Sequence, residues 1–231
     1  MPEHTPGPVA TAEATHVPEP PRQAAVRTST IRPVAFPWHR LPMLALALFS
    51  LTAGLDAATI LLGLPAPVVY DRLPEVHGML MTIGFVGTLI ALERAVALRQ
   101  VVAFVSPVLF GAGALLLITP LPLAAGQSLL VGGAAGLVAI YVPLWRRRPD
   151  DAVVVQALGA VLALGATILW LGGLDIARLL PWLVGFVVLT IGGERLELAR
   201  IHIGADQGAR LVALATFLTA AIVATTWTDA A

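Results

Sequence analysis

The sequence predicts an all-α fold, a polytopic bundle of about seven transmembrane helices. Apolar residues make up 58% of the 231 residues and charged residues only 12%, a balance far from that of soluble domains. Seven apolar stretches approach the length of about 20 residues that a helix needs to cross a bilayer. A related segment also occurs twice, at 84–99 and 185–200, which suggests a parallel internal repeat of helical units.

The N-terminal residues 1–37 are rich in Pro, Ala, Thr and Glu and lack apolar periodicity, so we expect a disordered cytoplasmic tail. The tail lacks the basic start, short apolar core and cleavage site of a signal peptide, and the first span is expected to act as the signal. The seven-helix transmembrane domain is predicted over 38–231. Its spans are expected at 41–63, 75–98, 101–120, 122–145, 152–173, 177–199 and 207–227.

The arginines predict the orientation of these spans. All fourteen basic residues are Arg, and with the N-terminus in the cytoplasm twelve fall on the inner side, leaving only Arg72 and Arg178 outside. This strong positive-inside bias places the C-terminus outside. The absence of Lys and Asn indicates a GC-rich genome, which favours a bacterial cytoplasmic (inner) membrane.

The repeated segment reads Gly-Phe-Val, then Ile, then Glu-Arg and a final Arg, and seven of its sixteen positions are identical in the two copies. Both copies fall on helices that run from outside to inside, so we expect parallel units related by an axis along the membrane normal. Two arrangements satisfy this: two three-helix units joined by a linker helix (3+1+3), or two four-helix units with the last helix missing. The alternative is a chance similarity in a biased composition.

Two Glu-Arg pairs, Glu93-Arg94 and Glu194-Arg195, lie about one turn from the inner ends of their helices. Adjacent helical residues point about 100° apart, so each Glu is expected to face its own Arg poorly. Across the axis, Glu93 is expected to meet Arg195 and Glu194 to meet Arg94. Such ion pairs fit either a structural clamp at the membrane interface or a cytoplasmic gate or ion pathway. Glu197 adds a third acid in the second copy alone.

Asp56 is predicted to lie near the middle of the first span. Thr52, Asp56 and Thr59 share one helix face at i, i+4 and i+7, giving an intramembrane polar stripe that must face protein or water. A carboxylate at this depth suggests a proton relay, a cation site or a substrate contact. The alternative is a buried acid that is protonated or hydrogen-bonded to a neighbouring helix.

His77 opens the second span and is followed by Gly78 and, one turn later, by Met81. This His-Gly-x-x-Met segment resembles the second helix of haem-copper oxidase subunit I and of the related NnrS-type multi-pass membrane proteins. The resemblance covers about twenty residues and implies haem b, with His77 as ligand and Met81 as a second cofactor-binding residue. Those families have about twelve spans and the oxidases carry further histidines on later helices, which this chain lacks. The alternative is an interfacial histidine held by a hydrogen bond.

Other kinds of site have little support. His39 and His202 fall on the same side of the membrane but form an incomplete metal site without acids or thiols, so the metal is unknown. The absence of Cys excludes disulfides and thiol chemistry, and the absence of Lys excludes a retinal Schiff base. No phosphate loop or hydrolase motif occurs, and nothing indicates nucleic-acid binding.

Three functional classes follow. We expect first a haem-associated or redox-related NnrS-like membrane protein. The second class is a small-molecule or ion transporter of 3+1+3 design, and the third is a structural or assembly subunit without a site of its own. No catalytic residue is identified, and the expected partners are the lipid bilayer and further subunits in a homo- or hetero-oligomer.

Overall fold

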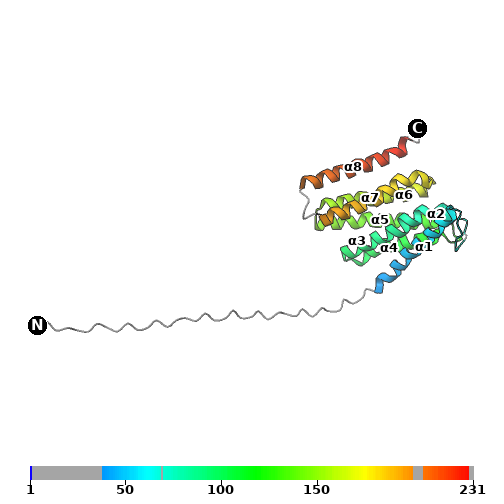
Figure 1. Cartoon of the computed structure of the whole chain (residues 1–231), viewed down its shortest axis with the longest axis horizontal. Coiled ribbons are helices and arrows are strands. Elements are labelled where there is room, and N and C mark those ends of the chain that lie inside the picture. The colour runs from blue at the N-terminus through cyan, green and yellow to red at the C-terminus, as the bar shows by residue number, and fades with distance from the viewer. Residues whose placement is uncertain (2–37, 69, 200–204, 229–231) are drawn as a thin grey trace. The chain divides into compact units, whose positions relative to one another are not determined.

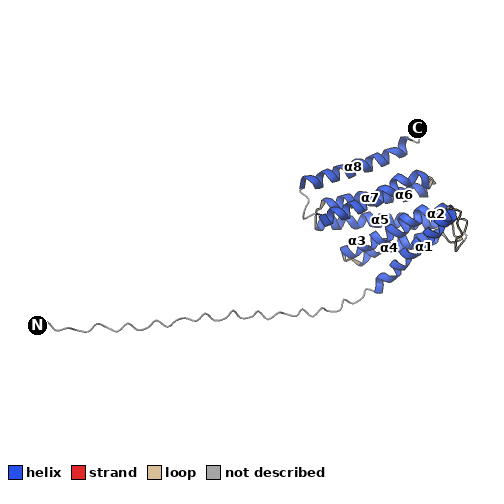
Figure 2. Cartoon of the chain, viewed as in Figure 1, coloured by secondary structure: helices blue, strands red, loops and turns tan. Residues whose placement is uncertain are grey.

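The helices of this chain form from long apolar runs that Pro and Gly interrupt. The computed structural model describes Met1 and residues 38–68, 70–199 and 205–228. Apart from Met1, the expected disordered tail lies outside the described residues. Every regular element in the described part is a helix (Figure 2), which confirms the all-α prediction.

The helices follow one another in a simple order. They are η1 (Trp38–Arg40), α1 (Leu41–Leu61), α2 (Leu73–Met79), η2 (Leu80–Gly87), α3 (Thr88–Leu98), η3 (Val101–Phe104), α4 (Val105–Leu117), α5 (Leu123–Arg147), α6 (Asp151–Leu171), α7 (Ile176–Ala199) and α8 (Ala205–Thr228). α2, η2 and α3 are consecutive parts of one long helix, Leu73–Leu98.

Six helices in the described part are long and apolar enough to cross a membrane. They are α1, the Leu73–Leu98 helix, α5, α6, α7 and most of α8. The helix formed by η3 and α4, Val101–Leu117, is also apolar but shorter. The architecture is that of a multi-pass membrane protein whose helices are in contact with lipid.

Turn residues end the helices where the backbone demands them. Gly63 follows α1 with φ 70°, and Gly173 follows α6 with φ 91°, a region that residues with a Cβ rarely adopt. The connection between α4 and α5, residues 118–122, contains two prolines. The Asp150 side chain accepts a hydrogen bond from the amide of Ala152 at 3.1 Å and so caps the start of α6.

Helices that follow one another in the chain run antiparallel and pack through small residues (Figure 1). α4 and α5 approach so closely that a Cβ built on Gly126 would lie 3.0 Å from the carbonyl oxygen of Gly113. Gly132 and Gly136 on α5 also face α4. Glycines of this kind let helix backbones approach inside a membrane.

The first glycine of each copy of the repeated segment lies in a three-helix junction. A Cβ built on Gly84 would meet side chains of α1 and α4, and one built on Gly185 would meet side chains of α6 and α8. The side chains concerned are Ser50, Ala114, Leu162 and Ile222. Each junction therefore joins the repeat helix to the helix before it and to a later one.

The Leu73–Leu98 helix changes its period in the middle. Residues 80–87 (η2) are π-helical, with wider turns than the flanking α2 and α3. The hydroxyl groups of Thr82 and Thr88 donate to the carbonyl oxygens of Gly78 and Gly84, which adds side-chain partners to the backbone here. The helix of the second copy, α7, is α-helical throughout. π-helical turns are rare and occur often at functional sites.

Candidate functional site

Arg94 on α3 is the one charged residue that is buried in the described part of the chain, with 7% exposure. Its Nη1 donates to Oε1 of Gln156 on α6 at 3.0 Å and lies 3.5 Å from Oε2 of Glu197 on α7. Its Nη2 donates to Oε1 of Glu93. One guanidinium therefore connects three helices that are far apart in the sequence.

A third acid completes this arrangement. The carboxyl group of Glu194 interacts electrostatically with Glu93, Arg94 and Glu197. Ionised carboxylates near one another repel, and the guanidinium of Arg94 beside them offsets part of that repulsion. We call Glu93, Arg94, Gln156, Glu194 and Glu197 the inner charge cluster, after the side of the membrane on which the positive-inside bias predicts it to lie.

The cluster differs from the expected exchange of partners between the two copies. Arg94 contacts its own neighbour Glu93, so the expectation of poor contact within a pair is wrong for the first copy. The long Arg side chain bends across the angle that separates adjacent helical residues. Arg195 is exposed, and among the described residues no ion pair joins it to Glu93. The two copies therefore occupy different environments.

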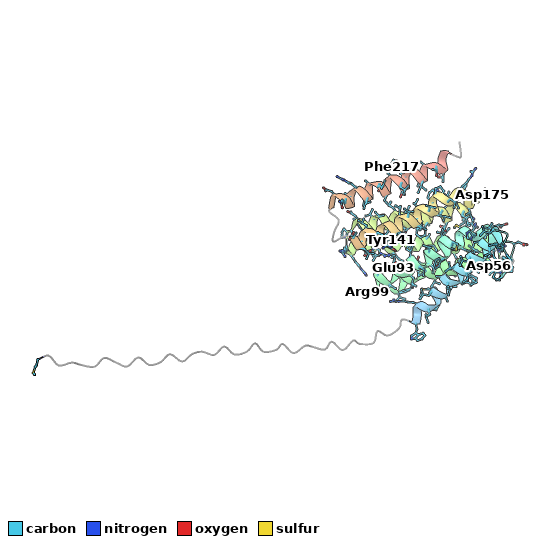
Figure 3. The ribbon with its side chains drawn as sticks, in the orientation of Figure 1. Asp56, Glu93, Arg99, Tyr141, Asp175 and Phe217 are labelled. Atoms are coloured by element: carbon cyan, nitrogen blue, oxygen red, sulfur yellow. The ribbon has the colours of Figure 1, made fainter. Side chains whose placement is uncertain are left out.

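Four buried polar atoms at or beside the cluster have no hydrogen-bond partner among the described residues. They are Nε of Arg94, the hydroxyl of Tyr141, Nε2 of Gln156 and Oγ1 of Thr190. Glycines bring α6 and α7 close together at these groups. A Cβ built on Gly159 of α6 would lie 3.0 Å from the Thr190 hydroxyl of α7, and Gln156 of α6 packs against Gly193 of α7. Figure 3 shows Glu93 and Tyr141 at the same end of the bundle. Unpaired buried polar groups are costly, so they indicate a place for an ordered water or an ion.

A polar cavity lies at the opposite end of the bundle, where Figure 3 shows Asp175. The cavity has a volume of about 590 Å³, and its wall includes Glu75, Gln127 and Asp175. Nε2 of Gln127 donates to the carbonyl oxygen of Trp170 at 3.2 Å, which fixes the amide in the wall. The two acids make this outer cavity attractive to cations.

Asp56 lies near the end of α1, because Leu61 is the last residue of that helix. The Asp56 Oδ2 accepts a hydrogen bond from the amide of Val68 at 3.2 Å, and its Oδ1 is buried without a partner among the described residues. Thr52 and Asp56 line a cavity of about 380 Å³, whereas the Thr59 hydroxyl donates to the Asp56 backbone at 2.7 Å. The carboxylate ties the α1–α2 loop to α1, and its depth near the middle of the membrane stays a prediction.

His77 is held by the neighbouring helix α1. Its Nδ1 lies 2.9 Å from the carbonyl oxygen of Gly54; a carbonyl only accepts, so Nδ1 carries the proton and Nε2 is left to bind a ligand. Met81 packs against the same Gly54 and, being on the same helix as His77, does not reach the opposite face of a haem. A Cβ built on Gly84 would lie 2.9 Å from the side chain of Ala114, so α4 packs closely against the His77 helix at that position. His77 is therefore the one haem-ligand candidate among the described residues of this region. It does not line the cavity of Asp56.

The remaining histidine prediction falls outside the structural description. His202 and the side chain of His39 belong to the residues that are not described. In the described part, no group of three or more His, Asp or Glu side chains is placed to hold a metal ion.

Sequence reasoning missed two buried polar residues at this end of the bundle, Gln156 of the inner charge cluster and Tyr141 beside it. The available signal was a polar side chain within an otherwise apolar span. Gln156 is the one amide side chain in Asp151–Leu171, and Tyr141 is the one tyrosine in Leu123–Arg147. Both are almost fully buried, as expected for polar groups that avoid lipid.

Comparison with known proteins gives one match. A family model described as Domain of unknown function (DUF8744) matches residues 40–231, a range that includes every helix from α1 to α8. No curated protein matches the chain. No solved structure matches it.

Proposed function

We propose that this chain, which belongs to the family described as Domain of unknown function (DUF8744), carries a small cation, protons included, across the membrane. The observation that carries this proposal is the inner charge cluster. It holds three acids around one buried guanidinium, Arg94, at the end of the bundle. Ionisable groups at membrane depth are expensive and mark ion and proton pathways.

The proposed architecture is a seven-span carrier of 3+1+3 design. In it, α1 to α4 form one unit, α6 to α8 form the other, and α5 is the linker. The equivalent junctions of Gly84 and Gly185 support this division, because each glycine packs against the first and third helices of its own unit. Arg94 crosses the interface between the units to reach Gln156 and Glu197. In repeat-based carriers the transport pathway runs along this interface.

Acids at both ends of the interface support a cationic substrate. The outer cavity presents Glu75 and Asp175, and the inner cluster presents Glu93 and Glu194. We propose that an incoming cation binds between the carboxylates of Glu93 and Glu194. The positive charge of Arg94 weakens cation binding there, and conduction requires binding weak enough for release.

We propose that the N-terminus and the inner charge cluster face the cytoplasm of a bacterial inner membrane. Support comes from the arginines, since most of them follow or precede the helix ends at the cluster side of the bundle. Those described at that side are Arg40, Arg94, Arg99, Arg146, Arg147, Arg148, Arg195 and Arg210. Arg72 and Arg178 lie at the other side, which fits the positive-inside rule.

Reconstitution into liposomes tests the proposal. Purified protein is incorporated into vesicles that contain a pH-sensitive dye, and a potassium gradient with valinomycin imposes an inside-negative potential. We expect faster acidification of the lumen, or faster uptake of radioactive sodium, than in protein-free vesicles. A double Glu93→Gln and Glu194→Gln variant is expected to slow this flux by about tenfold, equivalent to roughly 1.4 kcal/mol.

The matched control is Asp206→Asn, which neutralises an exposed acid at the start of α8 on the same side of the bundle. This variant should retain wild-type flux. A correctly folded wild-type protein that moves none of these cations faster than empty vesicles would rule out the proposed transport. Equal slowing by the control and by the double variant would remove the inner charge cluster from the mechanism.

A haem-associated protein is the second candidate, and it stays a prediction. Its support is the Nδ1 hydrogen bond of His77, which leaves Nε2 oriented as in histidine ligands. The test is the visible spectrum of the purified protein, oxidised and then reduced with dithionite, beside His77→Ala. Sharp reduced bands that disappear in the variant would support ligation by His77. A colourless protein after expression with ample haem would remove this candidate.

A further inference from the structure

The inner halves of α5 and α6 flank an apolar groove. Its volume is about 310 Å³, and aliphatic side chains form most of its wall. Val142, Trp145 and Val161 line the groove and are each more than 40% exposed. Because α5 and α6 are both long enough to cross the membrane, the groove opens toward the hydrocarbon, where an acyl chain is the natural occupant.

The inner end of this groove carries one arginine that has no ion-pair partner among the described residues. Of three consecutive arginines, Arg147 donates from Nη1 to the carbonyl oxygen of Leu98 at 2.7 Å. Arg148 lies 3.9 Å from the carboxylate of Asp150. Arg146 lines the groove, is exposed, and has no ion-pair partner among the described residues. Its charge is therefore available to an anion at the level of the lipid headgroups.

An aromatic ring closes the deeper part of the groove. Tyr141 lines the groove and is 3% exposed, and its hydroxyl is buried. It precedes Arg146 by five residues, which is about 7.5 Å along the helix axis and deeper in the membrane. The acyl chains of a phospholipid likewise lie deeper than its phosphate, so the ring is placed to contact an acyl chain.

We propose that this groove binds one anionic phospholipid. An acyl chain fills the apolar groove and contacts the ring of Tyr141, and the phosphate pairs with Arg146. The site does not depend on the carrier function. It does adjoin the inner charge cluster, because Tyr141 interacts electrostatically with Arg94.

Native mass spectrometry of the full-length protein tests the site. Delipidated protein in detergent is titrated with phosphatidylglycerol and, separately, with phosphatidylcholine. We expect one phosphatidylglycerol to bind more tightly than phosphatidylcholine. Loss of the Arg146 charge in Arg146→Gln should weaken phosphatidylglycerol binding by about fivefold, the factor for roughly 1 kcal/mol per arginine near a membrane surface.

Three further variants make the outcome specific. Arg210→Gln removes an exposed arginine at the same side of the bundle and should leave the affinity unchanged. Ala157→Phe fills the groove and should weaken both lipids, whereas Tyr141→Phe keeps the ring that lines the groove and should leave both affinities unchanged. Equal losses in the Arg146 and Arg210 variants, equal binding of the two lipids, or unchanged binding to Ala157→Phe would each overturn the proposal. Displacement of the lipid by inorganic phosphate alone would also overturn it.

Discussion

Replacing Arg94 by Met is expected to lower the free energy of unfolding by about 2–4 kcal/mol. Met keeps an apolar stem but removes the donor that pairs with Oε1 of the fully buried Gln156. Leaving that acceptor unpaired costs about 1–3 kcal/mol. The side chains of Glu93 and Glu197 are 56% and 48% exposed, so the loss of each ion pair adds at most about 1 kcal/mol.

A matched control and a double variant isolate the cause. Arg195→Met changes the equivalent exposed residue of the second copy and is expected to shift stability by no more than about 0.5 kcal/mol. Gln156→Leu combined with Arg94→Met removes both buried partners at once. Because two apolar groups need no hydrogen bonds, the double variant is expected to recover part of the loss, with a coupling energy of roughly 1–3 kcal/mol.

The assay is reversible unfolding of the purified protein in mixed micelles, followed by circular dichroism as the fraction of sodium dodecyl sulfate rises. The midpoints and slopes of the four proteins give the free energies for a double-mutant cycle. An Arg94→Met midpoint equal to that of Arg195→Met would refute the inferred burial of Arg94. Strict additivity in the double variant would refute its contact with Gln156.

Other features of the fold give three further expectations. Gly126→Ala should destabilise the protein by about 1–3 kcal/mol, because the new methyl group presses on the backbone of α4. Gly192→Ala places its methyl group in open space and should stabilise the protein by roughly 1 kcal/mol, because Ala favours a helix more than Gly does. Asp56→Ala removes the acceptor for a loop amide and should speed hydrogen exchange in the α1–α2 loop, whereas Asp56→Asn should not. Arg72→Gln removes hydrogen bonds to carbonyl oxygens of the α4–α5 turn and should speed exchange in 118–122. Equal effects within either matched pair, or unchanged exchange in that turn, would contradict these expectations.

The positions of the apolar helices could be predicted because crossing a bilayer imposes a minimum apolar length. The hydrogen bond between Asp56 and the α1–α2 loop could not be predicted. The apolar run continues to Gly63, but the helix stops at Leu61, and the following loop folds back so that the amide of Val68 reaches the carboxylate. A count of apolar residues contains no information about such a loop.

The partners of Arg94 were beyond sequence reasoning for a different reason. Periodicity relates residues within one helix, but a contact between helices depends on how each helix is rotated about its own axis. The repeated segment therefore indicated that Glu93 and Arg94 matter, but not that Arg94 points to Gln156. The same limit applies to His77, whose hydrogen bond to Gly54 depends on the packing of α1 against α2.

The π-helical turns of η2 give a physical reason for the inequality of the two copies. Gly84 precedes Arg94 by as many residues as Gly185 precedes Arg195. Each residue of α7 advances the helix by about 100°, whereas residues in the wider turns of η2 advance it by less. Arg94 therefore leaves its helix in a different direction from Arg195, and one side chain is buried while the other is exposed. A change of backbone period is thus enough to place two segments that share seven residues in different surroundings, one with its arginine buried and one with it exposed.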